Sequence, residues 1–175
     1  GNYLPTDLKE EVIDTKNTGY TGQQGLEELL KRSEDALKEA QITEEKKLLK
    51  RFFDELRSGG KVTYGIKEIL RALKMGAVEI LLISEDLEWE EIEYQCKNCE
   101  WSGKEFIKIE EKDDKVCPEC GGELGIIGER DVFEAMEEKA ENIGAETEVI
   151  SKDTQEGKQF YQLGGIGAIL RYRIS

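Results

Sequence analysis

The four cysteines of the chain fall into two pairs of the same form. Within each pair two residues separate the cysteines, and residues 100–116 separate the pairs. Two thiolates from each of two tight turns at this spacing are typical of a zinc ribbon. Four sulfur ligands leave no open position for water or a substrate, so we predict one structural zinc ion per chain. Its ligands would be Cys96, Cys99, Cys117 and Cys120.

The residues give little support for redox chemistry, nucleophilic catalysis or phosphate binding. A redox function for one cysteine pair would leave the other without a role. The sequence contains no histidine, which excludes imidazole bases, Ser-His or Cys-His nucleophiles and histidine metal ligands. The glycine-rich segment 164–167 lacks the Lys and Ser/Thr of a phosphate loop, so we interpret it as a turn. None of these patterns therefore indicates a catalytic site.

The amino-acid composition limits the kinds of molecule that the chain can bind. The 175 residues include 25 basic and 39 acidic ones, a net charge of −14. Such a surface repels phosphate backbones, which argues against autonomous nucleic-acid binding. No apolar run approaches the ~20 residues that span a bilayer. We expect a cytoplasmic protein that binds neither membranes nor specific nucleic-acid sequences by itself.

Two amphipathic helices are predicted from Gly22 onward. Apolar residues follow helical spacing from Leu26 to Ala40, and again from Leu48 to Leu56. Thr43 is a plausible N-cap of the second helix, so we expect the two to form a hairpin. The second helix carries a basic stretch, interpreted as a solvated face with phosphate binding as the alternative: Lys46, Lys47, Lys50 and Arg51.

Helices and strands then alternate along the chain. Strands are expected at residues 61–64, 78–83, 145–150 and 166–174, and helices from Ile66 to Gly76, from Asp131 to Gly144 and over 155–163. This order predicts an α/β sandwich with helices on both faces of a mixed sheet.

The cysteines lie in an insert within this alternation. We predict a lead-in over residues 1–21, the α/β sandwich over 22–88 and 129–175, and a zinc minidomain over 89–128. Short strands at 105–110 and 124–127 would bring the cysteine pairs together. The acidic run Glu85–Glu93 is interpreted as a solvated link into the insert, with a docking surface for a basic partner as the alternative.

Three segments carry a family resemblance: residues 45–53, 72–83 and 164–172. They resemble the C-terminal domain of the class 1 peptide chain release factors of archaea and eukaryotes, and the likeness covers nearly the whole chain. The four-cysteine insert resembles the archaeal form of the family's minidomain. The resemblance implies an α/β sandwich related to the kink-turn-binding ribosomal proteins, with the minidomain inserted after the central strand.

The resemblance also implies partners. In the family this domain docks a translational GTPase and later contacts the ABC-type recycling ATPase on the ribosome. The family's GTPase-binding motif matches here at Ile169, Leu170, Arg171 and Tyr172, with Ala168 replacing a glycine. Strand alternation would turn Arg171 outward as the contact and Tyr172 into the core.

The family's catalytic and codon-reading motifs are absent. No Gly-Gly pair is followed by Gln, and the Asn-Ile-Lys-Ser motif does not occur. We therefore expect a C-terminal piece of a longer factor that is not an enzyme by itself. The start at Gly1 and not Met agrees with this expectation. Three alternatives remain: the C-terminal domain of the Pelota-type rescue factor, which lacks a zinc minidomain; a kink-turn RNA-binding module of the same fold; and a zinc enzyme.

Overall fold

The computed structural model describes residues 22–174, so the predicted lead-in at 1–21 lies outside the described residues. The chain divides into two compact units, with the boundary between Glu45 and Lys46. The described part of the first unit is helical throughout. The second unit contains both sheets of the protein.

The predicted helical hairpin is wrong, because one helix, α2, runs without interruption over Gly22–Ser58. Thr43 is not an N-cap. Its hydroxyl instead donates a hydrogen bond to the carbonyl oxygen of Glu39, one turn earlier, at 2.9 Å. No glycine or proline lies between Ala40 and Glu44, and Ile and Thr each cost only about 0.5 kcal/mol in a helix. The break in the apolar stripe therefore does not end the helix.

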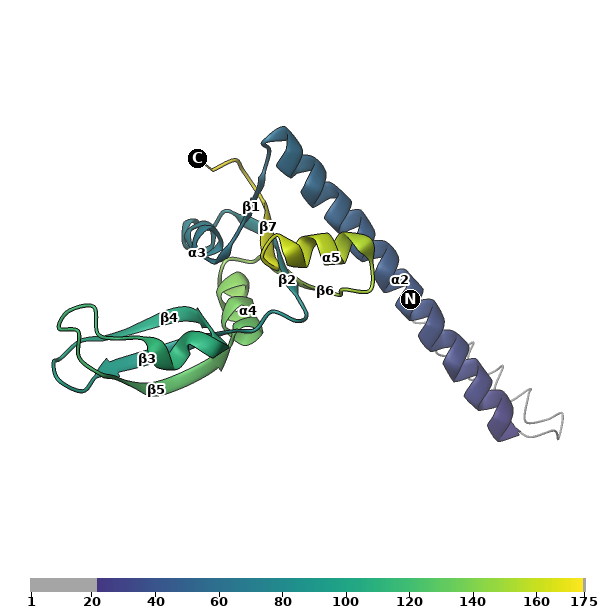
Figure 1. Ribbon diagram of the computed structural model, residues 1–175. Coiled ribbons are helices and arrows are strands. Elements are labelled where there is room, and N and C mark those ends of the chain that lie inside the picture. Colours follow the sequence, from purple (N-terminus) through teal and green to yellow (C-terminus); the bar gives the residue numbers. More distant parts are fainter. Residues whose placement is uncertain (1–21, 175) are drawn as a thin grey trace. The chain divides into compact units, whose positions relative to one another are not determined.

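The main sheet has four strands in the order β1-β7-β2-β6 (Figure 1). Only β2 and β6 are parallel, so the sheet is mixed as predicted. β2 is buried along most of its length and β7 along all of it, as expected of strands covered on both faces. The strands are β1 (Val62–Tyr64), β2 (Val78–Ser84), β6 (Glu146–Ile150) and β7 (Ile166–Leu170).

Helices cover both faces of this sheet. One buried cluster joins it to α3 (Ile66–Met75) and α4 (Val132–Asn142). The other joins it to α5 (Gln155–Gln162) and, through Leu49 and Phe52, to the last turns of α2. The helix ends agree with the sequence: the carboxylate of Asp131 accepts from the N–H of Phe133 at 2.8 Å, and Gly76 ends α3 with a left-handed backbone.

The insert forms a second, antiparallel sheet in the order β4-β3-β5. Its elements are β3 (Trp89–Cys96), β4 (Ser102–Lys108), the 3-10 helix η1 (Ile109–Asp114) and β5 (Leu124–Asp131). The acidic run is thus not a solvated link, because its second half is the central strand β3. Ile92 and Tyr94 are buried there, while Glu90 and Glu93 remain partly exposed. Glu90, on the same face as Ile92, pairs with Lys112. Glu91, on the other face, lies 4.0 Å from Lys139, so basic partners and not strict alternation accommodate these charges.

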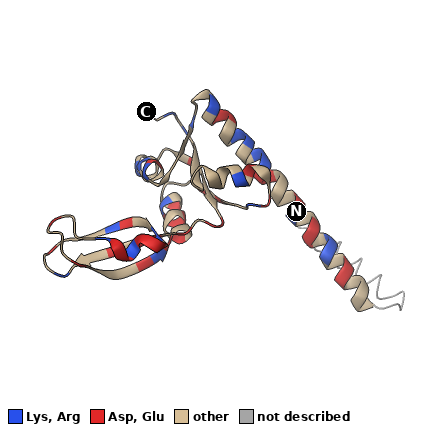
Figure 2. Cartoon of the chain, in the orientation of Figure 1, with Lys and Arg blue, Asp and Glu red and all other residues tan. Residues whose placement is uncertain are grey.

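Charge is unevenly spread over the second unit. Figure 2 shows acidic residues along the three-stranded sheet and basic residues on the last turns of α2. Arg51 pairs with Glu79 at 2.9 Å and Lys50 with Asp54 at 3.3 Å, as on an ordinary solvated helix face.

None of the helices in the described residues is both long and apolar enough to cross a membrane.

Candidate metal centre and C-terminal surface

The structure brings the four cysteine sulfurs together at one end of the three-stranded sheet. All four Sγ atoms lie within 4.8 Å of one another. Two pairs approach closely, Cys96–Cys120 at 3.5 Å and Cys99–Cys117 at 3.6 Å. A tetrahedral ion with zinc–sulfur bonds of about 2.3 Å would hold its sulfurs about 3.8 Å apart. The donor set and its spacing therefore fit zinc.

The first cysteine pair is positioned by the end of β3. Cys96 closes this strand, and its N–H donates to the carbonyl oxygen of Trp101 at 2.8 Å, which turns the chain back toward β4. The N–H groups of Asn98 and Cys99 both point at the Cys96 sulfur, at 3.3 Å. Such donors stabilise a thiolate, the form that binds a metal.

The second pair sits in a turn that needs glycine. Gly121 has a φ of 73°, and its N–H donates to the carbonyl oxygen of Cys117 at 2.8 Å. A side chain at Gly122 would collide with Asn98, between the two cysteines of the first pair. The N–H of Lys97 also donates to the carbonyl oxygen of Glu123 at 3.0 Å. The two turns are therefore closely packed and joined by backbone hydrogen bonding.

The thiols differ in acidity. Burial opposes ionisation of Cys96, but the N–H groups of Asn98 and Cys99 and the neighbouring thiols lower its pKa to about 6. At Cys99 the N–H of Trp101 favours the thiolate, yet burial and the other three thiols raise the pKa to about 12. Without a metal, one thiolate suppresses the next, whereas a divalent cation would favour all four.

The C-terminal residues do not lie as strand alternation predicts. β7 ends at Leu170, so the predicted strand to residue 174 is too long. Ile169 and Leu170 are each 1% exposed and offer a partner no accessible surface. Tyr172 is not a core residue: it is 44% exposed, and its hydroxyl donates to the carbonyl oxygen of Met75 at 3.2 Å. Arg171 and Tyr172 are the accessible part of the predicted contact surface.

Arg171 has a structural role that the sequence did not reveal. Its guanidinium donates to the carbonyl oxygen of Ile143, at the C-terminal end of α4, at 2.7 Å. A second, longer contact of 3.5 Å reaches the carbonyl oxygen of Gly76, at the end of α3. A cation suits helix C-termini, where backbone carbonyls lack partners. Arg171 therefore holds two helix ends beside the last strand.

Sequence comparison identifies the family. A family model described as eRF1 domain 3 matches residues 42–174. The chain belongs to this family. The peptide chain release factor subunit 1 of Thermococcus sibiricus is 40% identical over 181 residues, which cover 99% of this chain and 44% of that protein. The chain thus spans less than half the length of this relative.

Two solved structures extend the comparison. The C-terminal domain of the peptide chain release factor from Methanosarcina mazei matches with a TM-score of 0.75 and 32% identity, covering 88% of this chain and 98% of that one. The archaeal Pelota in a structure of ribosome-bound Pelota and ABCE1 matches with a TM-score of 0.56 and 24% identity, over 89% of this chain and 34% of that one. Release factor therefore fits better than Pelota, which shares the fold.

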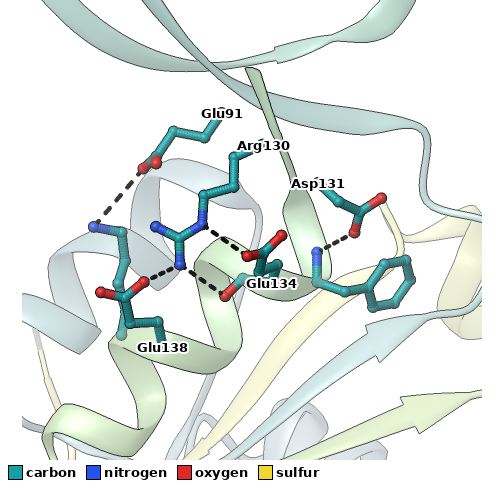
Figure 3. A network of polar contacts seen from close by, with 7 residues as sticks. Glu91, Arg130, Asp131, Glu134 and Glu138 are labelled. Carbon is teal, nitrogen blue, oxygen red and sulfur yellow. Dashed lines mark hydrogen bonds and ion pairs between the residues drawn. The ribbon is translucent and has the colours of Figure 1, made fainter. Parts of the chain in front are cut away.

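A polar network joins the insert of this release-factor domain to its α/β core (Figure 3). Arg130, on β5, forms ion pairs with Glu134 and Glu138 on successive turns of α4. Glu91, on β3, lies 4.0 Å from Lys139 on the same helix. Helical spacing from Glu134 to Glu138 was visible in the sequence, but their partner on β5 depends on the tertiary structure.

Proposed function

We propose that this chain is the interaction domain of a translation termination factor. It recruits a translational GTPase and then the ABC-type recycling ATPase to the ribosome in the cytoplasm, and it catalyses no reaction itself. Membership of the eRF1 domain 3 family is the observation that carries the proposal. Codon reading and peptidyl-tRNA hydrolysis belong to parts of a full factor that this chain does not span.

We assign the GTPase contact to the exposed residues that follow the last strand. Tyr172 is 44% exposed and Met75, whose carbonyl oxygen it contacts, is 46% exposed. Aromatic and arginine side chains are enriched among residues that dominate binding energy. Arg171 adds positive charge, while its hydrogen bond to Ile143 keeps the patch rigid. Tyr172 is therefore the proposed apolar anchor and Arg171 the charged neighbour.

Calorimetric titration with a purified archaeal translational GTPase of the elongation-factor class tests this surface. Tyr172→Ala should weaken binding by about 1–3 kcal/mol, the range for truncating an anchor residue. Lys158→Ala, an exposed basic residue on α5, is the control and should leave the affinity unchanged. A Tyr172→Ala chain that binds as tightly as the parent would remove this surface from the proposal.

Only a shared fold supports the recycling ATPase as a partner of this chain. The Pelota of the ribosome-bound structure with ABCE1 shares the fold of this chain. Binding of a purified archaeal recycling ATPase to this chain, measured with and without the GTPase, tests whether the two partners share one surface. Simultaneous binding of both would contradict the proposed exchange.

The zinc site is the second part of the proposal. Cys96, Cys99, Cys117 and Cys120 would hold one structural ion. The minidomain predicted over 89–128, whose last strand β5 continues to Asp131, would depend on this ion. An ion held by four thiolates has no open coordination position, so it would stabilise structure and activate no water.

RNA binding is the remaining alternative. Kinship with the kink-turn-binding ribosomal proteins would place an RNA-recognising fold in this chain, but the net charge of −14 opposes it. A salt titration against structured RNA decides: steeply salt-dependent binding at physiological ionic strength would favour the RNA module.

A further inference from the structure

A groove lies beside β4, one of the two edge strands of the three-stranded sheet. Glu105, Phe106 and Ile107 all line it, although neighbouring residues of a strand point to opposite faces. Three consecutive residues can border one space only where a strand presents its edge. In the described part of the chain, no backbone hydrogen bond joins the outer edge of β4 to another segment. The groove, of about 480 Å³, therefore follows an unpaired backbone edge.

The opposite wall of this groove is firmly held. It consists of residues from η1 and the position after it: Glu111, Asp114 and Lys115. Lys112, within η1, accepts a hydrogen bond on its carbonyl oxygen from the Tyr94 hydroxyl at 2.7 Å. Its ammonium group pairs with Glu90 and Glu129, each at 3.3 Å. A wall fixed in this way costs little ordering when a ligand binds.

Along this groove, the two faces of the three-stranded sheet differ in chemistry. Ile107 belongs to the small cluster on the η1 side, where the carboxylates of Glu111 and Asp114 have no ion-pair partner among residues 22–174. Glu105 on the same side is paired with Lys115 at 2.9 Å. On the other face Phe106 and Trp89 are partly buried against the main core. One face is thus acidic and the other aromatic.

We propose that the outer edge of β4 binds a short extended segment of a partner protein in which basic and apolar residues alternate. The segment adds a strand to the sheet through main-chain hydrogen bonds. Its Lys or Arg side chains face Glu111 and Asp114, and its apolar side chains lie beside Trp89 and Phe106. Residues 89–128 carry 11 acidic and 5 basic residues, so the whole region attracts such a segment.

This inference does not depend on the GTPase proposal, because the groove includes no residue of the C-terminal surface. A labelled peptide, Lys-Val-Arg-Val-Lys-Val, is the probe. Its control is Lys-Lys-Arg-Val-Val-Val, which has the same composition without the alternation. Anisotropy titration with the metal-loaded 175-residue chain should show the alternating peptide binding at least about fivefold more tightly, because only it matches the two-residue period of a strand. Equal affinities of the two peptides would show that charge alone drives binding, and this result would overturn the proposal.

Paired substitutions locate the site. Glu111→Gln with Asp114→Asn should weaken the alternating peptide about threefold to tenfold, the combined effect of two exposed charge contacts. The matched control, Glu146→Gln with Glu148→Gln, removes the same charge from exposed positions on β6, an edge strand of the other sheet, and should change nothing. Equal weakening by both double variants would overturn the assignment.

Hydrogen exchange tests the binding mode directly. The alternating peptide should slow exchange of amides in β4 and leave β6 unaffected. Protection confined to another element would contradict strand addition at this edge. Sedimentation of the free chain tests whether a second copy of this chain occupies the edge. A dimer whose β4 amides are protected without peptide would assign the edge to that second copy and overturn the proposal.

Discussion

The two sheets of this protein are stabilised in different ways. The four-stranded sheet is covered by helices on both faces and lies between two buried apolar clusters. The three-stranded sheet has a cluster of only three buried side chains, Ile92, Tyr94 and Ile107. Its strands are well paired, but an isolated small sheet buries too little apolar surface to be stable by itself. We propose that a metal ion bound by the four thiols at its end supplies the stability that this small core lacks.

This difference predicts which perturbation each sheet tolerates. The four-stranded sheet should respond to changes in packing and ignore the metal. The three-stranded sheet should depend on the metal and on its attachment to α4.

Metal removal is expected to have the largest effect. A strong chelator at neutral pH should unfold β3, β4 and β5, because structural zinc contributes about 10–16 kcal/mol to comparable small zinc domains. Hydrogen exchange should show loss of protection in these strands while β2 and β7 remain protected, and elemental analysis beforehand should give one zinc per chain. Loss of protection in β2 and β7 as well would show that the two sheets are not independent.

Truncation of Phe52 should have the next largest effect. This ring is fully buried, meets the ring of Phe160 edge to face at 5.5 Å between centroids, and covers Gly167. Phe52→Ala should lower the free energy of unfolding by about 3–5 kcal/mol, through lost burial and a cavity. Leu37→Ala, 66% exposed on the same helix, is the control for thermal melts and should cost under about 0.5 kcal/mol. Equal melting temperatures for the two variants would contradict the packing argument.

Arg171→Met should cost about 0.5–1.5 kcal/mol, because it removes the donor at the end of α4. The sequence-based expectation treated Arg171 only as an outward-facing contact residue. Denaturant unfolding measures the loss, and the neighbouring exposed Arg173→Met is the matched control. If both variants unfold alike, the hydrogen bond to Ile143 contributes no net stability.

Loss of Arg130 should have the smallest effect on stability. Its pairs with Glu134 and Glu138 are partly exposed, so Arg130→Gln should cost under about 1 kcal/mol. It should nevertheless loosen the attachment of the three-stranded sheet to α4, visible as a change in NMR residual dipolar couplings of β3 and β5 amides. Lys104→Gln, an exposed charge on β4, is the control. Unchanged couplings in Arg130→Gln would show that backbone continuity alone orients the insert.

Sequence patterns predicted most of the local structure. The ends of α3 and α4 follow from Gly76 and from the capping carboxylate of Asp131, which act within a few residues. The buried strand β2 follows from its continuous apolar run. The helical hairpin failed for a related reason: a local break in the apolar stripe is too weak to end a helix whose next turns are all good helix formers.

The sequence by itself determined the four-cysteine donor set, the alternation that forms a mixed sheet, and the family. Only the tertiary structure decided that half of an acidic run becomes the central strand β3, that Tyr172 is exposed, and that Arg171 binds the end of α4. The physical reason is the distance along the chain over which the determining contacts act. Turns, caps and paired cysteines depend on neighbours along the chain, whereas strand partners, helix-end contacts and the open edge of β4 depend on segments that meet only when the chain folds.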